Sequence, residues 1–117
     1  MKKIALLLVL ILVVSAPLSA LAVGRMGNEI YGVNLTFNGT TATCKAEVCP
    51  DYENDYSVIT MKLYSGNQLL HQWSKSSNGS FELVRTCTVT KGKTYTLTME
   101  LMVNGTSRSS RSVTKTC

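Results

Sequence analysis

Residues 94–103 carry the most regular pattern in the chain, an alternation of polar and apolar side chains that is strict from Thr94 to Leu101. Its apolar positions are Tyr95, Leu97, Met99, Leu101 and Val103. A period of two is typical of a β-strand that has one face in a core and the other in water. The stretch Lys91-Gly92-Lys93 precedes it and supplies a turn. We therefore expect residues 94–103 to form a central strand.

The rest of the chain after residue 22 shows no helical periodicity and divides into further strand-like segments. We expect these strands at 30–37, 41–48, 56–64, 68–74, 81–89 and 106–117. Asn-Gly pairs at Asn38, Asn78 and Asn104 separate several of them, and both residue types tolerate the positive φ of tight hairpins. The pattern predicts an all-β fold, a single antiparallel β-sandwich of about seven strands.

Two of these segments need comment. In 68–74, Leu69, His71 and Trp73 share one face, so Trp73 is expected to cover a sheet edge or cap the core. In 81–89 the inward set includes Arg85, whose charge is costly in a core. A β-bulge or an early exit from the sheet would relieve it.

The N-terminus has the three parts of a secretory signal peptide. Lys2 and Lys3 form a basic head, residues 4–14 are apolar, and Ala20-Leu21-Ala22 offers a cleavage site. The apolar run is too short to cross a bilayer as a helix, so we expect no membrane insertion. The domain boundaries are therefore 1–22 for the signal peptide and 23–117 for one secreted, extracellular domain.

Charge and length narrow the range of functions. Losing Lys2 and Lys3 with the leader reduces the net charge from +5 to +3. A balance this mild is unlike that of a nucleic-acid-binding protein. The remaining length suits one domain, and we expect a monomer that needs no cofactor.

The four cysteines all lie in the exported part of the chain. Their even number and compartment predict two structural disulfides. Their spacing does not match the short paired spacings of zinc sites. Four cysteines allow three pairings, and of these the preferred pairing joins Cys44 with Cys117 and Cys49 with Cys87.

Catalytic and metal-binding patterns are weak. His71 is the one histidine, and no acidic residue stands near it in sequence, so we expect no catalytic residues and no enzyme activity. The acidic loop 51–55 resembles the first half of a calcium loop. Tyr56 and Lys62 then occupy positions where a helix-loop-helix site needs glycine and glutamate. Calcium held between sandwich loops stays open as an alternative, and the prediction is no metal.

Three aromatic residues form a candidate ligand face. Tyr56 and Tyr64 share the outward parity of the strand 56–64, and Trp73 falls in the next strand. Aromatic side chains on one sheet surface offer a platform on which a sugar ring stacks. The alternative is that all three pack within the sandwich and bind no ligand.

The stretch Lys91 to Leu97 carries a family resemblance. Its Gly92-Lys93-Thr94-Tyr95 run looks like the entry to the penultimate strand of fibronectin type III and bacterial immunoglobulin-like domains, in which the tyrosine fixes a corner. Leu97 stands where antibody domains have a bridge cysteine, so their disulfide pattern does not carry over. With Cys44, Gln72-Trp73 and the terminal Thr116-Cys117, the chain is also similar to small secreted proteins of gram-positive bacteria that have no assigned function.

The resemblance implies an immunoglobulin-like fold and no particular chemistry. The leading hypothesis is a secreted, non-enzymatic binding or interaction module whose partner is an extracellular protein or a glycan. One alternative is a carbohydrate-binding or cell-envelope-binding domain that uses Tyr56, Tyr64 and Trp73. Another is a small extracellular hydrolase or inhibitor.

Overall fold

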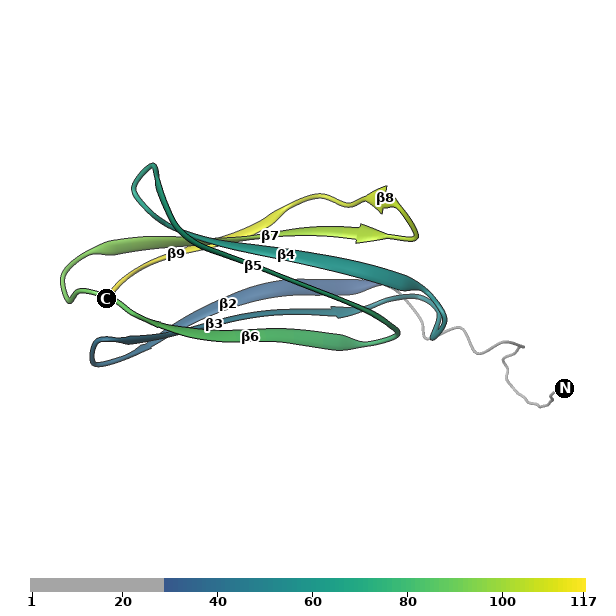
Figure 1. Cartoon of the computed structure of the whole chain (residues 1–117), viewed down its shortest axis with the longest axis horizontal. Coiled ribbons are helices and arrows are strands. Elements are labelled where there is room, and N and C mark those ends of the chain that lie inside the picture. Colours follow the sequence, from purple (N-terminus) through teal and green to yellow (C-terminus); the bar gives the residue numbers. More distant parts are fainter. Residues whose placement is uncertain (1–28) are drawn as a thin grey trace, which may run out of the picture.

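The computed structural model describes residues 29–117, so the predicted signal peptide, residues 1–22, lies outside the described residues. Two antiparallel sheets pack face to face as a β-sandwich (Figure 1). The strands are β2 (Ile30–Asn38), β3 (Thr41–Cys49), β4 (Tyr56–Ser65), β5 (Gln68–Asn78), β6 (Phe81–Thr88), β7 (Thr94–Val103), β8 (Thr106–Ser107) and β9 (Arg111–Thr116). The described part of the chain contains no helix that could cross a membrane.

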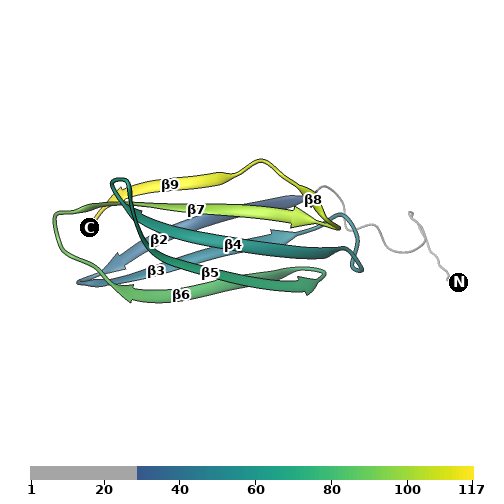
Figure 2. The same cartoon turned by 45° about the horizontal axis from the view of Figure 1, so that its top comes forward.

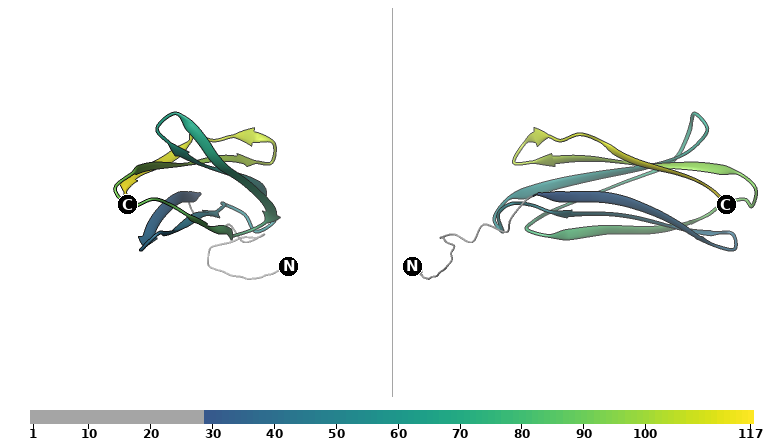
Figure 3. Two further views of the ribbon diagram at one scale, coloured as in Figure 1. Left: turned by 60° about the vertical axis from the view of Figure 1, so that its left-hand side comes forward. Right: turned by 180° about the vertical axis from the view of Figure 1, so that it is seen from behind.

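The first sheet has the order β2-β3-β6, and the second has the order β5-β4-β7, with β8 and β9 both paired to β7. The predicted fold class is therefore confirmed, as an immunoglobulin-like antiparallel sandwich. The expected last strand, 106–117, is divided into β8 and β9 by the segment 108–110. Figure 3 shows the two layers from the end and from behind.

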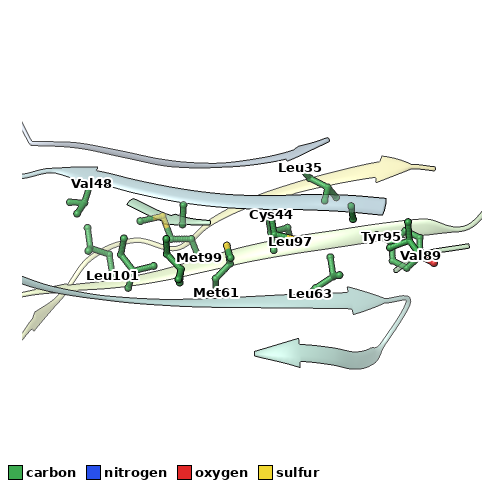
Figure 4. Packing of buried hydrophobic residues seen from close by; sticks show 14 of the residues in the cluster. Leu35, Cys44, Val48, Met61, Leu63, Val89, Tyr95, Leu97, Met99 and Leu101 are labelled. Carbon is green, nitrogen blue, oxygen red and sulfur yellow. The ribbon is translucent and has the colours of Figure 1, made fainter. Parts of the chain in front are cut away.

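The core lies between the sheets and is built from the predicted inward positions. On β7 the five predicted inward side chains are buried, whereas Met102 is exposed, and on β3 Ala42, Cys44, Ala46 and Val48 are buried. Ile59, Met61 and Leu63 of β4 are also fully buried. Figure 4 shows Met61 and Leu63 in the core. Each of these strands alternates buried and more exposed residues because successive side chains point to opposite faces of the sheet.

Tyr95 forms the corner that the sequence predicts at the entry to β7. Its ring is buried and its hydroxyl oxygen accepts a hydrogen bond from the Thr90 backbone N–H, 2.8 Å away. The Phe37 ring lies 6.0 Å from the Tyr95 ring. This corner fixes the connection through which the chain passes from β6 in one sheet to β7 in the other.

The turns follow from residues that adopt a positive φ. Asn104 and Gly105 both have positive φ, as a type I′ hairpin turn requires. Gly79, between β5 and β6, has a φ of +71°, and a Cβ there would lie 3.2 Å from the Glu53 carbonyl oxygen. Only glycine fits that turn without strain.

Two details differ from the sequence prediction. A register shift between Leu63 and Tyr64 places Leu69 opposite the outward-facing Tyr64, so Leu69 does not share a face with His71 and Trp73. The β3–β6 register runs through Arg85 without a bulge. Arg85 is exposed instead because β6 is an edge strand, from which an inward-facing side chain reaches water.

The two long sides of the sandwich are closed differently. On one side, which we call the closed side, side chains join β2 and the residue before it to β9 and the segment 108–110. Glu29 pairs with Arg108 at 2.8 Å, the Tyr31 hydroxyl donates to the Ser109 carbonyl oxygen at 2.9 Å, and the Arg111 guanidinium lies 4.2 Å from the Tyr31 ring centroid. On the other, which we call the open side, β5 and β6 diverge from their shared turn (Figure 2).

The two ends of the described chain lie at opposite ends of the long axis. Ile30 pairs with Cys49 at one end of the first sheet. The Cys117 thiol donates a hydrogen bond to the Gly39 carbonyl oxygen at the β2–β3 turn, at the other end. Figure 1 shows this separation along the length of the sandwich.

Candidate functional site

The three predicted ligand-face residues do not share a face. Tyr56 and Tyr64 lie on the outer face of β4, at its two ends, roughly 26 Å apart at the rise of a strand. Trp73 pairs with the buried Met61 and therefore faces the other way, toward the first sheet. The arrangement of Tyr56, Tyr64 and Trp73 as one platform is thus wrong.

Trp73 instead belongs to a cluster on the open side. Its half-buried ring packs against the edge of the core and stacks on the His71 ring, with centroids 5.2 Å apart and planes 10° from parallel. The two side chains are neighbours because residues two apart on a strand share a face. The indole thus has one part in the core and one part in contact with an exposed imidazole.

Two positive charges lie on the same inward-facing sides of β5 and β6. The Lys75 ammonium donates a hydrogen bond to the Glu82 carbonyl oxygen at 2.9 Å and lies 6.0 Å from the Phe81 ring. The Arg85 guanidinium donates to the Val84 carbonyl oxygen at 2.8 Å. Within residues 29–117 no carboxylate forms an ion pair with either side chain, whereas Lys45, Lys62 and Arg108 all have one. We call His71, Trp73, Lys75, Phe81 and Arg85 the open-side cluster.

The backbone of β5 is also available along this side. β5 is eleven residues long and stands at the edge of its sheet, with β4 as its one neighbour. An edge strand presents alternate N–H and C=O groups that no strand pairs, and such a row is a template for another strand. The irregularity near Leu69 lies at the hairpin tip, so the register from His71 to Asn78 is regular.

The catalytic and metal patterns that the sequence raised do not come together in space. The His71 ring stacks on Trp73 and makes no hydrogen bond with a serine or carboxylate among residues 29–117. In the acidic loop, Asp55 accepts hydrogen bonds from the Tyr52 backbone N–H and the Asn104 amide, so its oxygens stabilise the loop. The described ranges hold no group of three or more His, Cys, Asp or Glu side chains that could bind a metal.

A shallow hollow of about 450 Å³ lies on the outer face of the first sheet, at the end where β2 begins. Gly32 leaves it open because nothing lies within 4 Å of the position of a Cβ there. Glu47 and Glu82 border it, and Lys45 lies 3.9 and 3.4 Å from their carboxylates. The hollow is separate from the open-side cluster except at Phe81, which borders both.

The four cysteines are free thiols in this structure, so the predicted disulfides are not formed. The pairing of Cys49 with Cys87 is wrong on register. Cys87 lies opposite Ala42 near one end of β3, and Cys49 ends that strand, roughly 24 Å away. Cys117 lies at the β2–β3 turn, while Cys44 lies three residues inside β3. The contact that the structure does make is between Cys44 and Cys87.

Sequence reasoning missed Lys75, Phe81 and Arg85 as members of a site. The sequence did indicate that Arg85 is unusual, since a charged residue at an inward position marks either a strained site or a strand at the edge of a sheet. Lys75 gave none, because it stood in an expected polar turn that is in fact part of β5. Comparison with known proteins finds no family model that matches the chain and no curated protein that matches it.

Proposed function

We propose that the chain is a secreted, non-enzymatic binding module whose ligand is an acidic, extended segment of an extracellular protein. The observation that carries the proposal is the stacked His71–Trp73 pair on β5, with Lys75 two residues further along β5 and Arg85 at an inward position on β6. Neither cation has a carboxylate partner in the described ranges. Such a surface attracts negative charge and offers an aromatic contact at the same place.

The open side suits an extended segment better than a compact one. A segment laid along β5 adds to the second sheet as a further strand and takes up its unpaired backbone groups. Its acidic side chains then lie near Lys75 and Arg85, and an apolar side chain covers the exposed part of Trp73. Main-chain hydrogen bonds supply affinity in this mode, and the side-chain contacts select the sequence.

Export is part of the proposal. The leader 1–22 and the resemblance to small secreted proteins of gram-positive bacteria support it. Expression of the full chain in a gram-positive host should release a protein that begins at Val23 into the medium, and N-terminal sequencing would check the cleavage site. Retention of the uncleaved chain in the cells would contradict it.

The single tryptophan makes binding directly measurable. Because Trp73 is the one tryptophan in the sequence, its fluorescence reports on the open side alone. We expect an extended peptide of alternating glutamate and valine to change the emission, and a matched lysine–valine peptide to leave it unchanged. The K75E/R85E variant should weaken acidic-peptide binding by about tenfold or more, and added salt should weaken it in the wild type.

The matched control is K91E/K115E, which makes the same charge change at exposed positions away from the open side. It should bind the acidic peptide nearly as well as the wild type. Equal responses to acidic and basic peptides, or equal losses in the two double variants, would refute the acidic-segment proposal. A response to neutral oligosaccharides alone would assign the site to the carbohydrate-binding alternative.

A further inference from the structure

Cys44 and Cys87 lie on adjacent antiparallel strands and face the core. Cys44 pairs with Arg85, and Ala42 pairs with Cys87, so the cysteines are diagonal neighbours across the β3–β6 ladder. Diagonal neighbours have Cα atoms roughly 7–8 Å apart and Cβ atoms closer. This exceeds the usual Cα separation of a disulfide, roughly 4.4–6.8 Å, so the edge strand β6 must shift slightly to close the bond. Cys44 is fully buried in the core between the sheets (Figure 4), and Cys87 is half-buried.

The side chains of Cys44 and Cys87 lie close enough to affect each other's pKa. Burial raises the pKa of Cys44 to about 12, and the charge and hydrogen bond of Cys87 add to the rise. Burial also raises the pKa of Cys87, while the hydrogen bond from Cys44 opposes that rise. Cys87 is therefore the easier thiol to ionise.

We propose that Cys44 and Cys87 form a disulfide that joins the edge strand β6 to β3, and that Cys49 and Cys117 take no part in it. The inference rests on the register and on the contact between the two side chains. It does not depend on what the open side binds. Cys49 and Cys117 stay apart because they lie at opposite ends of the first sheet.

The bond forms by exchange with a low-molecular-weight disulfide such as oxidised glutathione. The Cys87 thiolate attacks one glutathione sulfur, the glutathione S–S bond breaks, and one glutathione leaves as a thiolate that takes up a proton. Cys44 then loses its proton and attacks the Cys87 sulfur, and the second glutathione leaves. Two protein thiols are thus oxidised while one glutathione disulfide is reduced to two glutathione thiols.

Accessibility determines the order of these steps. Cys87 is half-buried on the open side, so the oxidant reaches it, whereas Cys44 has no exposed surface. Exchange depends on the thiolate, so the raised pKa of Cys44 makes the second step slow in the folded protein. We expect oxidation of the native protein to be slow at pH 7 and several-fold faster at pH 9.

The sequence makes the pairing simple to map. Trypsin places the four cysteines on four peptides, 26–45, 46–62, 86–91 and 116–117. After incubation with oxidised glutathione, we expect a non-reduced digest of the protein to contain 26–45 joined to 86–91. Peptide 46–62 should carry free Cys49 or its glutathione adduct. A link between 26–45 and 116–117, between 46–62 and 86–91, or no link to 86–91 would overturn the proposal.

Stability gives a second, independent measurement. The bond closes a loop of about forty residues, so oxidation should raise Tm by about 10 °C or more, and a reductant should reverse the gain. The C49S/C117S variant should keep both the linked peptides and the reversible gain. The C44A/C87A variant should show neither. If the rise in Tm persists in C44A/C87A, or is lost in C49S/C117S, the stabilising disulfide involves other thiols and the proposal is wrong.

Discussion

Along the closed side, an ion pair, a hydrogen bond and a cation–π contact join the start of the chain at β2 to β9 and the segment 108–110 before it. On the open side, Lys75 links β5 to β6 near their turn, and the strands then diverge. The difference follows from the order of the chain. β5 and β6 are consecutive but belong to different sheets, so one short turn must carry the chain across the sandwich. β2 and β9 have no such connection, and side chains alone close the gap between them. Charges are therefore paired on the closed side and left available on the open side.

The largest expected effect on stability tests whether β6, on the open side, still packs one face into the core. Leu83 on β6 is fully buried, so Leu83→Ala should lower the free energy of unfolding by about 2–5 kcal/mol. Its neighbour Val84 is exposed, and Val84→Ala should change it by no more than about 0.5 kcal/mol. Urea denaturation would measure both. Equal effects would mean that β6 is not packed as described.

The Tyr95 corner lies between β6, on the open side, and β7, which pairs with β9 on the closed side. Tyr95→Phe leaves the Thr90 N–H without its partner and should cost about 1–3 kcal/mol of stability. Tyr64→Phe is the control, because the Tyr64 hydroxyl makes no hydrogen bond with the described residues. Thermal unfolding should separate the two variants clearly. A neutral Tyr95→Phe would show that water replaces the tyrosine at this corner.

The two sides should respond differently to the loss of an arginine. Arg108→Ala breaks a partly buried pair with Glu29 and should cost about 1 kcal/mol, less in high salt. Arg85→Ala removes an exposed cation without an acidic partner in the described ranges, so stability should change by less than about 0.5 kcal/mol. Chemical denaturation at low and high salt would measure both losses of stability. Equal losses in the two variants would contradict the predicted difference between the two sides.

The smallest effect is a pH dependence of the reduced protein. The pKa of Cys44 rises from 9.0 to about 12 in the folded state, so the fold is stabilised while the thiol keeps its proton. This stability is complete below pH 9 and is lost as the pH rises toward 12. At pH 9.5 the loss should be below about 1 kcal/mol. The loss is measured as the difference in the pH dependence of stability between the wild type and C44A/C87A.

Alternation alone predicted most of the fold. The inward positions of β3, β4 and β7 were read correctly because each strand has one buried and one more exposed face. The corner at Tyr95 was also found, since the glycine-bearing turn three residues before it is a local signal. These features depend on residues close together in the chain, which is why one sequence suffices to place them.

The errors arose where the answer depends on which strands are neighbours. Cysteine spacing does not show that Cys87 lies beside β3 near Ala42, so Cys49 was assigned as its partner. The parity of Trp73 relative to Tyr64 depends on a register shift that sequence does not reveal. Arg85 was judged awkward because the pattern does not tell an edge strand from a central one. The open-side cluster combines residues from two sheets, and no single segment contains its signal.

The placement of Ile30 and Cys117 at opposite ends of the long axis has a mechanical consequence. A force applied through these two points acts along the strands, so it loads the β2–β3 and β7–β9 ladders in shear. Thr94 and Thr96 also contact Thr116 and Thr114 through their hydroxyl groups, which adds cross-links to the second ladder. All these bonds share the load together instead of breaking one after another. A domain tethered at both ends would therefore resist extension well beyond what its equilibrium stability suggests.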